Sequence, residues 1–256
     1  MAAGKRQSTQ RRRRMTAATA TGIQKSSIPL LPRDLIVEVL ARVACRSLDD
    51  FVNAKLSCQE WCQLGDESYV YKHASLAKFQ ILPGWKQQSA EKKRKTTLFL
   101  YKCIDAGNPE ALFRTGVVGF FGCTEPIEYA LECLKRAGNE GHVGAAYTIC
   151  MISILFLGGE HREKGIMVLS AMKESKELKE RVREAREELV RILRMIWKNK
   201  LRVRIQRPVC CSTADHCSRK RGWDFDEEDT SAECAYCRCD FEVFHVHKAL
   251  PLLPLS

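Results

Sequence analysis

The sequence predicts a mainly α-helical protein with a small cysteine-rich module near its C-terminus. Three observations predict this class. Apolar residues recur at helical spacing over most of residues 28–197, and a unit of about 34 residues repeats within that stretch. Six of the thirteen cysteines crowd between Cys210 and Cys239, which is typical of a separate small module. A chain of 256 residues has room for one or two compact units with linkers.

The basic excess, a net charge of +11, is concentrated in Arg11–Arg14, in Lys92–Lys95 and in residues 191–207. Basic runs in low-complexity sequence are typical of nuclear-import signals or solvated tails. The seven other cysteines fall singly in apolar helical stretches, where they behave as small hydrophobic residues in a reducing compartment. We therefore expect a location in the nucleus, the cytoplasm or both. No apolar run is long enough for a membrane span.

Residues 1–27 are rich in Arg, Thr and Ala without apolar periodicity, so we expect a disordered basic tail. A first helix is predicted after Pro32, where Leu35, Ile36, Val39 and Leu40 recur at helical spacing. Ser47 and Asp50 have the spacing of a capping box, which predicts the start of a second helix. A third short helix is predicted around Trp61.

The run Leu31-Pro32-Arg33-Asp34-Leu35-Ile36, then Glu38-Val39-Leu40, then Lys55-Leu56-Ser57-Cys58-Gln59-Glu60-Trp61, resembles an F-box. The resemblance implies a trihelical cluster over residues 28–82 that docks on the Skp-type adaptor of a cullin-RING ubiquitin ligase. The alternative is three ordinary core helices. By position, the residues implied as adaptor-binding are Leu31, Pro32, Leu35, Ile36, Leu40, Leu56 and Trp61.

A polar linker is expected over residues 83–97, followed by helical repeats over 98–172. Gly107–Ala111 is echoed by Gly141–Ala145, and Glu125–Glu128 by Glu160–Glu163, at offsets of 34 and 35 residues. The spacing of Gly and Ala resembles Sel-type repeats, relatives of the tetratricopeptide class, in which paired helices stack on their neighbours. A plain helical bundle is the alternative.

A long charged helix is predicted over residues 173–206. Its apolar positions recur at heptad spacing for three heptads only, which favours a capping helix on the repeats over a coiled-coil dimer. These positions are Leu178, Val182, Ala185, Leu189, Ile192 and Ile196.

The cysteine-rich module is expected over residues 207–248, with a tail over 249–256. Cys211 and Cys217 followed by Cys234 and Cys237 form two thiol pairs, the donor set that structural zinc favours. The first pair is wider than usual, and the ligand set stays open because other donors lie nearby. These are Cys210, His216, Cys239 and His245.

The F-box resemblance implies a non-catalytic receptor subunit of a Skp-cullin-F-box ubiquitin ligase, with a target bound by the repeats or the cysteine-rich module. Its partners would be the adaptor, a cullin and an unnamed target. The alternative is a nucleic-acid-binding protein that uses the basic helix and the zinc-type finger. An enzyme is not expected, because the sequence has no Gly-rich phosphate loop, nucleophile elbow or His-Glu-x-x-His helix.

Overall fold

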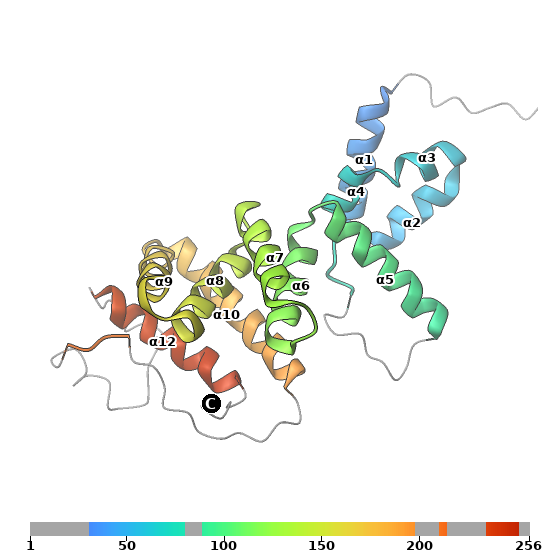
Figure 1. Ribbon diagram of the computed structural model, residues 1–256. Coiled ribbons are helices and arrows are strands. Elements are labelled where there is room, and N and C mark those ends of the chain that lie inside the picture. Colours follow the sequence, from blue (N-terminus) through green and yellow to red (C-terminus); the bar gives the residue numbers. More distant parts are fainter. Residues whose placement is uncertain (1–30, 80–88, 198–209, 214–233, 251–256) are drawn as a thin grey trace, which may run out of the picture. The chain divides into compact units, whose positions relative to one another are not determined.

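The computed structural model describes residues 31–79, 89–197, 210–213 and 234–250 (Figure 1). Within these ranges the chain forms helices and no strand, which confirms the mainly α class. The tail predicted over residues 1–27 lies outside them. The helices are α1 (Arg33–Arg46), α2 (Leu48–Ser57), α3 (Gln59–Leu64), α4 (Ser68–His73), α5 (Ala90–Asp105), α6 (Pro109–Gly122), α7 (Ile127–Asn139), α8 (Val143–Ile152), the π-helical η1 (Ser153–Leu157), α9 (Gly159–Ala171), α10 (Lys176–Ile196) and α12 (Ala235–Ala249).

Helices α1 to α4 form a small cluster around a hydrophobic core that also includes Cys103 of α5 and Ala111 of α6. In α1, Ile36, Leu40 and Ala44 recur every four residues and turn one face inward, where they meet Phe51 of α2. One half of the predicted capping box of α2 is confirmed, since the Ser47 hydroxyl accepts a hydrogen bond from the Asp50 amide at 3.2 Å. The other half is not formed, because the Ser47 amide donates to the Val43 carbonyl. The first helices of the chain therefore form where the capping and apolar signals place them.

Helix α5 begins at Ala90, inside the stretch 83–97 that was expected to be a linker. Charged residues support it locally, because Glu91 pairs with Arg94 at 3.6 Å and with Lys95 at 3.2 Å, one turn away. This first part of the helix carries no apolar stripe. Apolar periodicity therefore could not detect it, although Ala, Lys and Glu are good helix formers.

The pairs α6–α7 and α8–α9 repeat the same local geometry. Each pair is entered through a left-handed glycine, Gly107 at φ +78° and Gly141 at φ +82°. The next residue then caps the first helix of the pair. Asn108 accepts from the Ala111 amide at 3.1 Å, and His142 accepts from the Ala145 amide at 3.0 Å. The 34-residue repeat predicted from the sequence is thus present as a repeated structure.

Close approach of the paired helices depends on one glycine in each repeat. A Cβ on Gly116 of α6 would lie 2.8 Å from the carbonyl oxygen of Ala130 in α7. In the second repeat the small residue is on the other helix. A Cβ on Gly165 of α9 would lie 3.2 Å from the carbonyl oxygen of Cys150 in α8.

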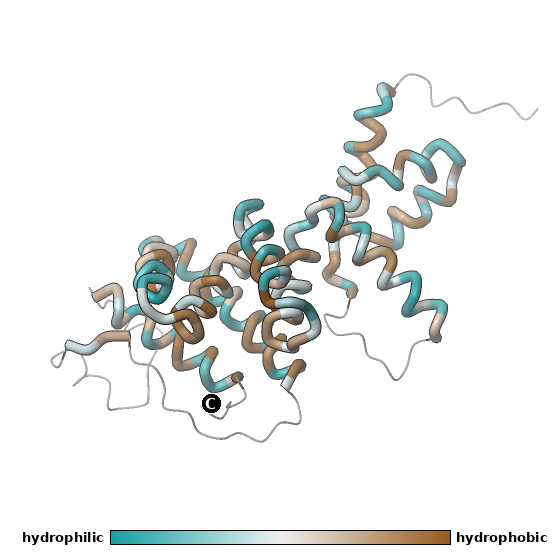
Figure 2. Tube along the Cα trace, in the orientation of Figure 1, coloured by the Kyte–Doolittle hydropathy of each residue, from teal (hydrophilic) through white to brown (hydrophobic). Residues whose placement is uncertain are grey.

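Helix α10 and helix α12 complete the core of the repeat region. Val182, Leu189 and Ile192 of α10 are buried together with Val243 and Val246 of α12. In Figure 2 hydrophobic residues dominate α6 and α8, whereas α10 alternates hydrophobic and hydrophilic residues, as a helix with one buried face does. Helix α10 thus packs on the repeats as the predicted capping helix. None of the described helices is long and apolar enough to cross a membrane.

Candidate functional site

The outer faces of α1 and α2 carry large apolar side chains that nothing in the described chain covers. Leu35 and Val39 lie one turn apart on α1 and are 51% and 41% exposed. Val52 and Leu56 lie one turn apart on α2 and are 51% and 78% exposed. Residues four apart lie on the same side of a helix, so each pair makes a continuous apolar strip. We call these four residues the apolar face.

The seven residues that the F-box resemblance implies as adaptor-binding fall into two groups. Leu31, Pro32, Leu35 and Leu56 are exposed. Ile36 and Leu40 are buried at 7% and 0% exposure. Trp61 is half-buried and packs against the same core. The first group is available to a partner, and the second holds the helices that present it.

An ionic cluster joins the end of α3 to α5 beside this core. The Asp66 carboxylate accepts hydrogen bonds from Lys102 at 2.8 Å and from the Tyr71 hydroxyl at 2.5 Å, and it pairs with Lys55 at 3.0 Å. Partial burial opposes ionisation of Asp66, but these donors outweigh it and hold its pKa well below the ordinary value. Burial, together with the bond to Asp66, raises the pKa of Tyr71 to about 12.

Three of the four predicted zinc ligands come together at the start of α12. The sulfur atoms of Cys211, Cys234 and Cys237 all lie within 4.8 Å of one another, and the Cys211–Cys234 sulfur pair is 3.9 Å apart. Cys217, the fourth predicted ligand, lies outside the described residues, as does His216. The cysteine cluster predicted near the C-terminus is therefore present.

The other two cysteines of this region belong to the core. Cys239 is fully buried, and its thiol donates to the Ile166 carbonyl at 3.4 Å. Burial raises the pKa of Cys239 well above its ordinary range, and burial beside Asp240 raises the pKa of Cys210 to about 12. Both cysteines are buried members of the hydrophobic core of the repeat region.

The spacing of the three clustered sulfurs fits a tetrahedral thiolate site. With Zn–S bonds of about 2.3 Å, tetrahedral geometry places the sulfurs about 3.8 Å apart. The Cys211–Cys234 separation of 3.9 Å is close to this distance. Two of the thiols also lie at the N-terminus of α12, where a helix favours negative charge. The three cysteines of the cluster can therefore hold a metal ion.

A buried charged network beneath this cluster was not anticipated from the sequence. The Glu242 carboxylate, 1% exposed, accepts from Lys173 at 2.7 Å, from Arg186 at 3.1 Å and from the Tyr147 hydroxyl at 3.0 Å. These groups lie far apart in the chain and join α12 to α8, α10 and the end of α9. The only sequence signal is Glu242 itself, a carboxylate between the apolar residues Phe241 and Val243.

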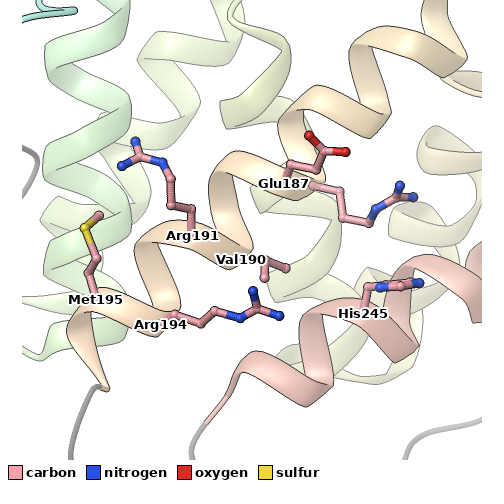
Figure 3. Close-up of a pocket in the computed structure, with 7 residues that line it drawn as sticks. Glu187, Val190, Arg191, Arg194, Met195 and His245 are labelled. Carbon is pink, nitrogen blue, oxygen red and sulfur yellow. The ribbon is translucent and has the colours of Figure 1, made fainter.

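A cleft with a volume of about 530 Å³ opens between α10 and α12 (Figure 3). It was also missed from the sequence, because it combines residues from two helices whose packing no local pattern specifies. Its walls are formed by Arg186, Glu187, Val190, Arg191, Arg194, Met195 and His245.

Comparison with known proteins found a family model that matches the repeat region. The family described as plant tetratrico peptide repeats matches residues 77–194, which include the paired helices α6 to α9 and most of α10. No solved structure matches the chain.

The chain is also similar to curated plant proteins. It is 32% identical over 142 residues to the F-box protein At1g67623 of Arabidopsis thaliana, covering 56% of this chain and 45% of that protein. It is 27% identical over 154 residues to the F-box protein At2g35280 of the same plant, covering 60% of this chain and 88% of that protein. It is 24% identical over 139 residues to the F-box protein At1g67340, of which the chain covers 35%. The chain thus spans less than half of the length of the first and third of these relatives. The predicted resemblance is confirmed: the chain is similar to plant F-box proteins, and its residues 77–194 match the model for plant tetratrico peptide repeats.

Proposed function

We propose that this protein is a non-catalytic substrate receptor of a Skp-cullin-F-box ubiquitin ligase. In this proposal the cluster α1–α4 binds the Skp-type adaptor, which connects it to a cullin. The helical repeats or the cysteine-rich module bind the target protein. The relatives named as F-box proteins support this assignment.

The observation that carries the proposal is the apolar face. Leu56 is 78% exposed and Leu35 is 51% exposed, on helices that each also supply buried residues to the core. A helical cluster this small buries little surface by itself, so a partner that covers these side chains stabilises both. A protein-binding role explains apolar side chains at positions where the core does not need them.

The receptor acts by proximity. Holding the target and the ubiquitin-charged enzyme in one assembly raises their effective concentration without any chemical step on this chain. The residues of α1 and α2 then contribute binding energy alone. The ionic cluster around Asp66 and the buried residues Ile36 and Leu40 keep the binding helices in place.

The test is adaptor binding by the double variant Leu35→Ala with Leu56→Ala. Each truncation removes apolar area that the adaptor would cover, worth roughly 1–3 kcal/mol per side chain. We expect at least a tenfold loss of affinity for a purified Skp-type adaptor in calorimetry. Folding should persist because both side chains are exposed.

The matched control is Leu98→Ala with Met167→Ala, which truncates apolar side chains that are 55% and 57% exposed outside the cluster. This control should bind the adaptor as the unmodified chain does. Equal affinity of the unmodified chain and of Leu35→Ala with Leu56→Ala would overturn the proposal.

We also propose that Cys211, Cys234 and Cys237 hold a structural zinc ion, with Cys217 as the fourth ligand. Sulfur spacing and donor chemistry support zinc, since four thiolates in a closed tetrahedral set are its usual structural site. Its role would be to fix the segment around Cys211 to the start of α12. No step of ubiquitin transfer passes through it.

Metal analysis tests this site. We expect about one zinc ion per purified chain, because a four-thiolate set binds a single ion. Cys234→Ser with Cys237→Ser should lose that zinc and melt at a lower temperature. The exposed pair Cys45→Ser with Cys62→Ser is the control and should keep it. Unchanged zinc content in the first variant would exclude these ligands.

We further propose that the protein acts in the nucleus, the cytoplasm or both. Cys103, Cys133 and Cys150 are buried free thiols, which suits a reducing compartment. A fluorescent fusion of the full chain, imaged in plant cells, tests this location.

A further inference from the structure

We propose that the cleft between α10 and α12 is a docking site for an acidic segment of a target protein, one that carries Asp or Glu beside an apolar residue. That the ligand is a ubiquitination target rests on the proposed function. The recognition of negative charge rests on the cleft itself. Its volume of about 530 Å³ suits a few side chains of a peptide.

The charge of the cleft is predominantly positive. Arg186, Arg191 and Arg194 line it together with a single carboxylate, that of Glu187. Two of the guanidinium groups already have partners. Arg186 donates to Glu242 at 3.1 Å, and Arg191 pairs with Glu188 at 2.6 Å.

Arg194 is the cation that remains available. It is exposed, and within the described ranges of the chain it makes no hydrogen bond or ion pair. In Figure 3 its guanidinium reaches from α10 toward His245 on α12, across the floor formed by Val190. A guanidinium group that is free of other partners can bind a carboxylate through two parallel hydrogen bonds.

The cleft also has apolar lining residues, which can recognise an apolar side chain of the ligand in addition to its negative charge. Val190 and Met195 are half-buried in the wall of the cleft, beside Arg191 and Arg194. An apolar residue next to the acidic one can cover them, and it would partly exclude water from the ion pair and so strengthen it. The expected ligand therefore combines one acidic and one apolar side chain within a short segment.

A nucleic acid suits this surface less well. Acidic residues are interleaved with basic ones along α10, and exposed pairs such as Arg191 with Glu188 cancel charge locally. A phosphate backbone needs a continuous basic track, whereas acidic residues interrupt the basic ones along α10.

Fluorescence anisotropy with the purified full chain tests the inference. The probe is a short fluorescein-labelled peptide with an Asp-Glu-Leu core, compared with the same peptide carrying Asn-Gln-Leu. We expect saturable binding of the acidic peptide and at least tenfold weaker binding of the amide peptide. Arg194→Gln should weaken the acidic peptide about tenfold, the equivalent of 1.4 kcal/mol, and Arg194→Lys should weaken it less.

The matched control is Arg181→Gln. Arg181 is exposed on the same helix but does not line the cleft, so its variant loses the same charge and should change affinity less than twofold. Equal weakening by Arg181→Gln and Arg194→Gln would show diffuse attraction and overturn the site. Equal binding of both peptides would overturn it as well.

The same assay distinguishes the proposed target segment from two other possible occupants of the cleft, a nucleic acid and an acidic segment of this chain. If a DNA oligonucleotide displaces the acidic peptide at a lower concentration than unlabelled peptide does, the cleft is a nucleic-acid site and the inference fails. If binding appears only after Asp226, Glu227, Glu228 and Asp229 are changed to amides, the occupant is this chain's own acidic run. The adaptor is absent from the assay, so loss of adaptor binding and loss of peptide binding are independent results.

Discussion

At the scale of single residues, Asp66 shows how a surface carboxylate organises the F-box-like cluster. Lys102, Lys55 and the Tyr71 hydroxyl converge on it, and they hold its pKa well below the ordinary value despite partial burial. Because the folded-state pKa is lower than that of the unfolded chain, the stabilisation is complete above about pH 4 and is lost as the pH falls toward the folded-state value.

Asp66→Asn should therefore lower the free energy of unfolding at neutral pH and matter less in acid. We expect a loss of roughly 0.5–1 kcal/mol at pH 7, because the group is partly exposed and screened by solvent. Urea denaturation at pH 7 and at pH 3 measures the difference between variant and unmodified chain. A difference that stays constant between the two pH values would show that the ionised carboxylate is not what stabilises the cluster.

Individual residues were predicted best where a local pattern determines them. Ser47 was placed as a cap from its spacing to Asp50 alone, and the hydrogen bond is present. Leu35 is exposed whereas its neighbour Ile36 is buried, and the sequence alone does not predict this difference in exposure. Both are apolar, and only the packing of α1 against its neighbours decides which of them faces outward.

At the scale of elements, the close packing of the paired helices α6 and α7 depends on Gly116, which has no side chain. A methyl group on Gly116 would lie 2.6 Å from Cγ of Leu134 and 2.8 Å from a backbone oxygen, which cannot move away without shifting the helix. Overpacking of this kind costs about 1–3 kcal/mol.

Gly116→Ala should accordingly destabilise the repeat region by that amount, measured as a lower midpoint of urea denaturation. Gly122→Ala, at the end of the same helix, is the control. Its nearest atoms would be 3.6 Å away or more, so a methyl group there meets ordinary contacts. If Gly116→Ala were as stable as the control, the close approach of the helices would not limit stability.

The elements themselves were largely predictable, and the reasons for the exceptions are physical. Apolar periodicity located α1, the repeats and α10. It missed the beginning of α5, where i,i+4 charge pairs rather than a buried face support the helix. The cysteine spacing located three of the clustered thiols, but it did not indicate that the last of them stand on a helix, α12, which enters the core of the repeats.

At the scale of the whole molecule, Glu242 links segments that are distant in the chain. Tyr147 of α8, Lys173 just after α9, and Arg186 of α10 all donate to one buried carboxylate on α12. Contacts of this sequence separation are not encoded in any local pattern, which is why neither the network nor the neighbouring cleft was foreseen. Such a network holds α12 in one place against the repeats.

Glu242→Gln should release α12 from the repeats. The amide keeps the shape of the side chain but leaves Lys173 and Arg186 as buried cations without their carboxylate, which costs roughly 3–5 kcal/mol. Hydrogen exchange should show loss of protection in α12 before the rest of the repeat core. Glu188→Gln, which breaks the exposed pair with Arg191, is the control and should change stability by less than about 1 kcal/mol. Unaltered protection of α12 in Glu242→Gln would mean that apolar packing alone fixes this helix.

The exchanged positions of Gly116 and Gly165 bear on how degenerate repeats are recognised. In the first unit the leading helix supplies the small residue and the following helix the backbone oxygen, and in the second unit these roles are reversed. A column-by-column alignment of the two units scores both positions as mismatches, although the interhelical contact has been kept. Duplicated helical pairs that have diverged this far are better compared contact by contact, since both copies share a glycine that faces a backbone oxygen of the paired helix, although the glycine stands at different positions.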